Sequence, residues 1–407
     1  MVESDQEIIM QLTRKIAEDT FYIGASDRRL ALFENIYPIE RGVSYNSYIV
    51  MDEKTVLLDT VDHAVSLQFI ENLEYVLDGR TLDYIIVNHV EPDHCGVYGE
   101  LIARFPEVKL VGNAKTMTFL SQFFRFDVCS RAVVVKEGDT LNTGKHEFAF
   151  VFAPMVHWPE VMVTFDKTTG CLFSADAFGT FGALSGNLFA DELDFEHEWL
   201  DDARRYFINI VGKYGLQTMN ILKKASKLDI KMLCPLHGPI WREDLDWYIQ
   251  KHITWASYMP EDDNGVLVVY SSIYGNTENA AMYVGQKLSE KGVKNIHMYD
   301  ASVTDTSYLL AECFKYGKVV FAAPTYNLDI FPKMEHLLMD LKAHQWQNRK
   351  VAVIECGTWA LASGKKMREY LEGMKNITIV NDTVSIKSSA KDSQAAEFDA
   401  LVDAILA

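Results

Sequence analysis

The chain has 407 residues, a formal net charge of −18 at pH 7 and an apolar content of 48%. This length suits two to three domains with substantial cores, and the negative charge disfavours nucleic acid as a partner. The sequence contains no apolar run of about 18 residues and no leader-like start, so we expect neither a membrane span nor a secretory signal.

The cysteines are far apart and form no Cys-x-x-Cys pair. This pattern favours a reducing cytoplasm and excludes a four-cysteine metal module within the sequence. We therefore expect a cytoplasmic protein without such a module. The six positions are Cys95, Cys129, Cys171, Cys234, Cys313 and Cys356.

A polar loop after the apolar run 84–87 is the first candidate site. The run predicts a buried strand, and the loop places four metal-capable side chains within six positions, where alternate residues can face two metals. Glu91 is a hard oxygen donor, which favours iron or manganese over the zinc that a histidine there would suit. A polar loop that only caps a strand would be the alternative. The candidate ligands are His89, Glu91, Asp93 and His94.

Three further donors follow predicted strands in the same half of the chain. One such residue is more often structural, but together with the loop they indicate a dinuclear site. Two divalent irons and three carboxylates with a bridging hydroxide would be nearly neutral, and nitrogen and oxygen donors leave positions open for a diatomic ligand. Zinc, without redox chemistry, would make the site a hydrolase. These donors are His157 after 148–152, Asp176 after 170–175 and His237 after 230–233.

In order and spacing, the seven donors resemble those of the flavodiiron proteins (A-type flavoproteins), and residues 1–259 resemble a metallo-β-lactamase-like αββα sandwich. The resemblance implies reduction of O₂ to water, of NO to N₂O, or of both. It also implies a ligand set for each iron: His89, Glu91 and His157 for one, Asp93, His94 and His237 for the other, with Asp176 as the bridge.

Two neighbouring positions also follow from the resemblance. Tyr206 matches a tyrosine that can donate a hydrogen bond to the bound gas. An early histidine of many members has no counterpart here, because the matching stretch reads Leu32-Phe33-Glu34-Asn35. Glu34 or Asn35 would have to take its place.

A second α/β pattern begins after a polar, turn-forming linker at 260–265. The run 266–270 predicts a buried parallel strand, and residues from 278 to about 291 predict a helix. Hydroxyls and amides between a strand and a helix N-terminus form a phosphate cradle, and the absence of a Walker lysine favours a monophosphate. The loop resembles the FMN phosphate loop of flavodoxins, and consists of Ser271, Ser272, Ile273, Tyr274, Gly275, Asn276 and Thr277.

Two later loops follow the predicted strands 319–322 and 351–354. Ligands of open α/β sheets bind at such carboxyl ends, and an aromatic residue in each loop could face an isoalloxazine ring or be ordinary packing. We therefore expect residues 266–407 to form a flavodoxin-like doubly wound parallel sheet that binds FMN. The candidates are Pro324, Thr325, Tyr326, Asn327, Gly357, Thr358 and Trp359.

The two predicted sites together favour redox chemistry over hydrolysis. FMN and two irons together store four electrons. Reduction of O₂ to water needs four electrons, and reduction of two NO to N₂O needs two. The chain would then depend on an external donor, which could be rubredoxin, a nicotinamide-linked reductase or a deazaflavin. The resemblance implies a head-to-tail homodimer or a dimer of such dimers. The rivals are a zinc hydrolase fused to a flavodoxin-like module and an electron-transfer flavoprotein with a degenerate metal domain.

Overall fold

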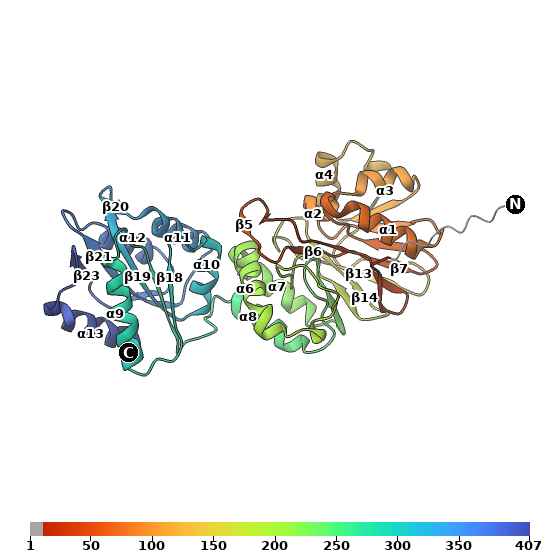
Figure 1. Ribbon diagram of the computed structural model, residues 1–407. Helices are drawn as coiled ribbons and strands as arrows, with labels where there is room; N and C mark the ends of the chain where they lie inside the picture. The colour runs from red at the N-terminus through yellow and green to blue at the C-terminus, as the bar shows by residue number, and fades with distance from the viewer. Residues whose placement is uncertain (1–10) are drawn as a thin grey trace. The chain divides into compact units, whose positions relative to one another are not determined.

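The computed structural model describes residues 11–407, which form two compact units (Figure 1). The first unit extends to Ala203 and includes Gln217–Ile249, and the second comprises Arg204–Leu216 and Gln250–Ala407. The units differ from the predicted ranges 1–259 and 266–407 because two earlier segments pack with the second unit.

Contacts of these segments explain the difference. The Arg205 guanidinium donates to the hydroxyl of Ser307 (3.0 and 2.9 Å), and the Asn209 amide donates to the Ser307 carbonyl (3.1 Å). In the predicted linker, the backbone amides of Glu261 and Asp262 both donate to the Lys315 carbonyl (2.9 Å each). Residues 260–265 are therefore fixed to the second unit.

The first unit is an αββα sandwich. Its sheets have the orders β1-β2-β7-β8-β9-β10-β11 and β12-β13-β14-β15-β16, and their inner faces share one apolar core. Figure 1 shows α1 (Ser66–Leu77), α3 (Tyr98–Arg104) and α4 (Ala114–Phe123) on one side of the sheets and α7 (Gly215–Ala225) on the other. The strands are β1 (Arg14–Ala17), β2 (Thr20–Tyr22), β7 (Tyr48–Met51), β8 (Thr55–Leu58), β9 (Tyr84–Ile86), β10 (Lys109–Gly112), β11 (Ala132–Val134), β12 (Thr140–Asn142), β13 (Glu147–Phe152), β14 (Met162–Asp166), β15 (Cys171–Phe173) and β16 (Met232–Cys234).

Strand pairing brings the donor-bearing loops to one edge of this sandwich. β8, β9 and β10 are parallel in one sheet, and β15 and β16 are parallel in the other, so their carboxyl ends meet. The amide of Ser174 donates to the Cys234 carbonyl (3.1 Å), and the amide of Leu236 donates to the Ala175 carbonyl (3.0 Å). These bonds hold the segment after β15 beside the segment after β16.

The second unit is a doubly wound sheet with the parallel order β18-β17-β19-β21-β22. Figure 1 shows α9 and α13 on one face and α10, α11 and α12 on the other. The strands are β17 (Val266–Tyr270), β18 (Ile296–Asp300), β19 (Lys318–Tyr326), β20 (Asp329–Ile330), β21 (Arg349–Gly357), β22 (Ile377–Ile379) and β23 (Val384–Lys387). The helices are α9 (Asn276–Glu290), α10 (Thr306–Lys315), α11 (Pro332–Ala343), α12 (Ser363–Glu372) and α13 (Ala395–Leu406).

The predicted strands are present, with corrected ends. The predicted strand 230–233 begins only at Met232, and the metal loop contains a helical turn, α2 (Pro92–Cys95). β19 and β21 continue through residues predicted as loops, to Tyr326 and Gly357. Within residues 11–407, no helix combines the length and apolar character needed to cross a bilayer.

His146 connects the two sheets of the first unit. Its buried ring donates Nδ1–H to Asp166 Oδ2 (2.9 Å), with Nε2 3.9 Å from Asp19 Oδ2, and its backbone amide donates to Asp52 Oδ2 (2.8 Å). Burial lowers the pKa of His146, but Asp166, Asp52 and Asp19 raise it by more, so the net shift is upward. The imidazolium therefore stabilises the fold.

This raised pKa predicts a pH-dependent stability. The contribution is present below the ordinary value of 6.5 and is lost as pH rises through the higher folded-state pKa. We expect His146→Gln to cost about 1–3 kcal/mol at low pH and less at high pH. Calorimetry of the holoprotein and the variant at about pH 6 and about pH 9 measures the difference in Tm. An equal loss at both values would contradict the assignment.

Candidate metal centre and flavin site

The structure brings the seven predicted metal donors together. They form two adjacent groups, and within each group the candidate ligand atoms lie within 4.8 Å of one another. The first group comes from the ends of β9 and β15 and the β13–β14 connection, and the second from α2 and the end of β16. The groups are His89, Glu91, His157 and Asp176, and Asp93, His94 and His237.

Asp176 faces both groups with different oxygens. Its Oδ2 lies 3.2 Å from His89 Nε2 and 3.1 Å from His157 Nε2. Its Oδ1 lies 3.1 Å from His94 Nε2 and 3.6 Å from His237 Nε2. One oxygen for each group is the arrangement that a carboxylate bridging two metals requires.

The remaining carboxylates each serve one group. Glu91 Oε2 lies 3.2 Å from His89 Nε2 and 2.9 Å from His157 Nε2. Asp93 Oδ2 lies 3.3 Å from Nε2 of both His94 and His237. All four imidazoles therefore present Nε2 towards carboxylates.

Burial and unsatisfied polar atoms fit a bound metal pair. Both carboxylate oxygens of Asp93, Nε2 of His94 and Oδ1 of Asp176 are buried without a hydrogen-bond partner in the described part of the chain. Buried polar atoms left unpaired are costly, and metal coordination removes that cost. The Cys95 thiol donates to the Val90 carbonyl (3.2 Å). The donors are thus nitrogen and oxygen without thiolate, which suits iron.

The carboxylates also change the proton affinity of the imidazoles. Burial lowers the pKa of His157, but hydrogen bonds to Asp176 and Glu91 raise it, to about 10. Burial lowers and the charges of Asp93 and Asp176 raise the pKa of His94, to about 8. Metal binding to these nitrogens must therefore release protons.

The loop after β17 has the features of a phosphate cradle. Ser271 Oγ is fully buried and has no hydrogen-bond partner among residues 11–407, and Ser272 Oγ accepts from the amide of Gly275 (3.0 Å). Gly275 has a φ of 88°, which favours glycine, and α9 begins at Asn276. The free amides of the first helical turn follow the loop, where a phosphate binds well.

The two other candidate flavin loops are tied together by hydrogen bonds. Thr325 Oγ1 accepts from the backbone amides of Ala362 (2.9 Å) and Ser363 (3.2 Å), so this hydroxyl positions a loop. A Cβ on Gly357 would lie 1.9 Å from the Ala360 carbonyl oxygen, so only glycine fits there. The loops are therefore built to hold a fixed shape.

Large aromatic side chains are exposed in all three flavin loops. The exposed fraction is 90% for Tyr274, 77% for Trp359 and 44% for Tyr326. Side chains of this size bury most of their surface in folded proteins. Ring surfaces left bare at the carboxyl edge of the sheet fit an aromatic ligand such as FMN.

Comparisons with known proteins agree with both predicted domains. The family model described as ODP family beta lactamase matches residues 43–238, and the flavodoxin model matches 268–400. An anaerobic nitric oxide reductase flavorubredoxin from Pectobacterium atrosepticum is 31% identical over 354 residues, 86% of this chain and 68% of the relative. The chain belongs to the flavodiiron protein family.

Solved structures of flavodiiron proteins agree over nearly the whole chain. The rubredoxin oxygen:oxidoreductase of Desulfovibrio gigas has a TM-score of 0.90 at 27% identity and covers 97% of this chain and 98% of its own. A mutant flavo di-iron protein from Thermotoga maritima has a TM-score of 0.88 at 26% identity, with the same coverage. The predicted fold class is confirmed, and the chain is an oxidoreductase with FMN and a non-haem diiron site.

Asp59 is a buried residue of this flavodiiron protein that sequence reasoning missed. Its Oδ1 accepts from the amides of Asn88 (2.7 Å) and His89 (3.2 Å), and its Oδ2 accepts from the Asn88 side chain (2.8 Å). Asp59 thereby fixes the start of the metal loop. A carboxylate directly after the apolar strand β8 was the available signal.

Glu34 occupies the tip of a hairpin near the metal groups. β4 (Leu32–Phe33) and β5 (Tyr37–Pro38) are joined by a turn in which Glu34 and Asn35 have φ values of 48° and 58°. The Glu34 carboxyl hydrogen-bonds Glu91, and burial together with the Glu91 charge raises the pKa of Glu34 to about 8. Of the two residues that could replace the missing histidine, Glu34 is the one that contacts a candidate ligand.

Tyr206 lies at the end of α6 (Leu200–Tyr206), before a π-helix at Phe207–Val211. Its side chain is 1% exposed, and it belongs to the second compact unit. Its contact with the bound gas stays a prediction.

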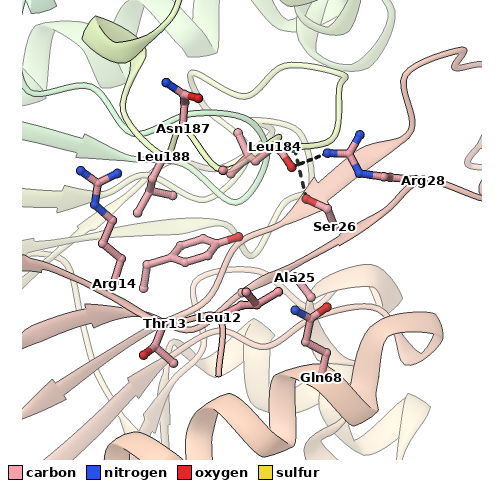
Figure 2. Close-up of a pocket in the computed structure, with 13 residues that line it drawn as sticks. Leu12, Thr13, Arg14, Ala25, Ser26, Arg28, Gln68, Leu184, Asn187 and Leu188 are labelled. Atoms are coloured by element: carbon pink, nitrogen blue, oxygen red, sulfur yellow. Dashed lines mark hydrogen bonds between the residues drawn. The ribbon is translucent and has the colours of Figure 1, made fainter. Parts of the chain in front are cut away.

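The first unit also has a separate pocket of about 350 Å³ (Figure 2). Its lining residues include no His, Cys, Asp or Glu that could bind a metal. Figure 2 shows Arg28 donating to the Leu184 carbonyl (2.6 Å) and Ser26 Oγ accepting from the Leu184 amide (3.1 Å). Arg14 pairs with Glu192 (2.9 Å between Nη1 and Oε2). Both guanidinium groups of the pocket, those of Arg14 and Arg28, therefore already bind groups of the protein.

Ser271 provides a test of the phosphate cradle. We expect Ser271→Ala to weaken FMN binding about 10- to 100-fold, because a hydrogen bond to a charged group is lost. Fluorescence titration of the flavin-depleted protein with FMN measures the change. Ser302→Ala, which also removes a buried hydroxyl without a hydrogen-bond partner in the same unit, is the matched control. Unchanged affinity in Ser271→Ala would place the phosphate elsewhere.

Proposed function

We propose that this chain reduces O₂ to water, NO to N₂O, or both, with electrons from an external donor. The observation that carries the proposal is the pair of His and carboxylate groups that share Asp176 in a chain that also has a flavodoxin-like unit. Two irons held by these residues would supply a binding site for the gas, and bound FMN would supply electrons.

The protein's own residues would hold and separate these groups. Asp176 would bridge the irons, Glu91 would set the preference for iron, and the imidazoles would leave a face open to gas. Tyr206 would donate a hydrogen bond to the gas. The ligands proposed for one iron are His89, Glu91 and His157, and for the other Asp93, His94 and His237.

The flavin is proposed to bind across the three loops at the carboxyl edge of the second sheet. Ser271, Ser272, Asn276 and Thr277 would surround its phosphate, and the first-turn amides of α9 would face it. The exposed rings of Tyr326 and Trp359 would cover the isoalloxazine.

We also propose a head-to-tail homodimer, alone or paired into a dimer of dimers. This proposal rests on the resemblance to flavodiiron proteins, because residues 260–265 pack with the second unit and do not form a free linker whose length could limit the flavin. Activity per chain should then fall on dilution below the dimer dissociation constant. Full activity of a monomer at high dilution would contradict this arrangement.

The names of the relatives suggest candidates for the substrate and for the electron donor. Relatives named as anaerobic nitric oxide reductases and as a rubredoxin oxygen:oxidoreductase make both gases and a rubredoxin-type donor candidates. A nicotinamide-linked reductase or a deazaflavin remains an alternative donor. We place the reaction in the cytoplasm, in keeping with the unpaired cysteines.

Anaerobic gas consumption tests the proposal. The reduced protein loaded with two irons per chain should consume O₂ or NO much faster than the same FMN-containing protein without iron. Equal rates would assign the reaction to flavin autoxidation. Zinc in place of iron, with cleavage of a thioester or lactam, would support the hydrolase alternative.

A further inference from the structure

Glu160 is a fully buried carboxylate behind one of the candidate metal ligands. It lies in the β13–β14 connection with an exposed fraction of 0%. Its Oε1 accepts from Nδ1 of His89 (2.7 Å) and from the amide of Val90 (3.0 Å). Its backbone carbonyl accepts from the Asn113 side chain (2.6 Å), which fixes the residue from a second direction.

The basic side chain that faces this carboxylate among residues 11–407 is the His89 imidazole, with 2.7 Å between Nδ1 and Oε1. Oε2 of Glu160 is buried and has no hydrogen-bond partner among residues 11–407. A buried carboxylate without an opposite charge is costly. The nearest group that can carry positive charge is the His89 ring, whose Nε2 points into the metal groups. Glu160 is thus placed to act on whatever binds there.

In the second group, the Nδ1 atoms of His94 and His237 are not hydrogen-bonded to a carboxylate among residues 11–407. Nδ1 of His237 donates to the Ser44 carbonyl (2.8 Å), which is neutral. Nδ1 of His94 is buried and has no hydrogen-bond partner in the described chain. Among the described residues, His89 is the one of these three imidazoles whose Nδ1 is hydrogen-bonded to a carboxylate.

We propose that Glu160 is a positioning residue that makes the two metal sites electronically unequal. A carboxylate that accepts Nδ1–H makes the imidazole a stronger electron donor and fixes its orientation. The iron bound by His89, Glu91 and His157 would therefore stabilise the ferric state more than the iron bound by Asp93, His94 and His237. When an added oxidant removes one electron from the diferrous pair, that electron leaves the iron at His89.

This inference rests on the ligand set proposed above and can fail separately from it. The protein is loaded with ⁵⁷Fe and titrated anaerobically with ferricyanide, which takes up one electron per step. Iron content tests the ligand set, and Mössbauer spectra with the two midpoint potentials test the role of Glu160. Two irons per chain with indistinguishable sites would support the proposed function and overturn this inference.

Glu160→Gln provides the direct test, because it keeps the shape and an acceptor oxygen but removes the charge. We expect the first oxidation to become at least about tenfold less favourable, which corresponds to about 59 mV for one electron, while the second changes less. Glu160→Asp, which keeps the charge, should lie closer to the natural protein. An equal shift of both steps, or none, would overturn the proposal.

Asp59→Asn is the matched control. It also removes a buried carboxylate near the metal loop, but Asp59 accepts from backbone amides and an amide side chain and not from an imidazole. A general loss of negative charge would shift the first potential equally in both variants and would contradict a specific role of Glu160. Where Glu160→Gln also loses iron, loss confined to one Mössbauer site supports the inference, and equal loss from both overturns it.

Discussion

Replacing Asp176 with alanine is expected to remove most of the bound iron and to lower gas reduction by more than about 100-fold. This carboxylate offers one oxygen to each histidine group and is 2% exposed. Without it, four imidazoles would surround two dications with only two ligating carboxylates. Metal analysis and anaerobic consumption of O₂ and NO by the purified, reduced variant measure both effects.

An exposed carboxylate of the same unit serves as the control. Asp229→Ala removes a side chain with 88% exposure whose neighbour is Lys231 at 3.7 Å. It should leave iron content and gas reduction unchanged. If Asp176→Ala kept its iron and full gas reduction, the proposed bridge would be wrong and an electron-transfer flavoprotein would become the better description.

Replacing Glu91 with histidine should change the metal preference of the site from iron to zinc. The carboxylate lies 3.2 and 2.9 Å from Nε2 of His89 and His157, so an imidazole there would give three neutral nitrogen donors in one group. Loss of a negative hard donor disfavours iron and leaves a set that zinc accepts. We expect weaker iron retention, more zinc and loss of gas reduction.

Reconstitution with equal amounts of ferrous iron and zinc, followed by metal analysis, measures this preference directly. Glu91→Asp keeps the negative oxygen donor and should still select iron, although more weakly because its carboxylate reaches less far. Unchanged iron content and activity in Glu91→His would refute the role given to Glu91.

The metal donors could be found from the sequence because each follows an apolar strand. That local pattern marks the strand end, and parallel pairing then brings the ends together, as for Asp176 after β15 and His237 after β16. Glu160 could not be found in this way because it precedes β14, and although Asp59 follows β8, that position does not reveal what Asp59 contacts. They act through contacts to His89 that are separated by 71 and 30 residues, and a single carboxylate carries no pattern that reveals such a partner.

The ends of elements were predicted less well where packing overrides local preference. The sequence predicts a loop after the strand 319–322, and Pro324 within it is a residue type that disfavours a central strand. In the structure β19 pairs with β21 as far as Pro324 and Cys356, and it continues to Tyr326 because Thr325 and Tyr326 pair with β20. Helical residues before 217 gave no sign that they pack against α10, because the contacts of Arg205 and Asn209 with Ser307 join residues 102 and 98 positions apart.

The placement of Arg204–Leu216 in the second unit has a consequence for recombining parts of this family. The flavin-binding body is not one continuous stretch of chain, because a piece of it is encoded before the last strand of the metal-binding body. A chimera joined at residue 266 would exchange the sheet but keep Arg205 and Asn209 facing a foreign partner for Ser307. A faithful exchange therefore has to carry both Arg204–Leu216 and the chain from Gln250 onward.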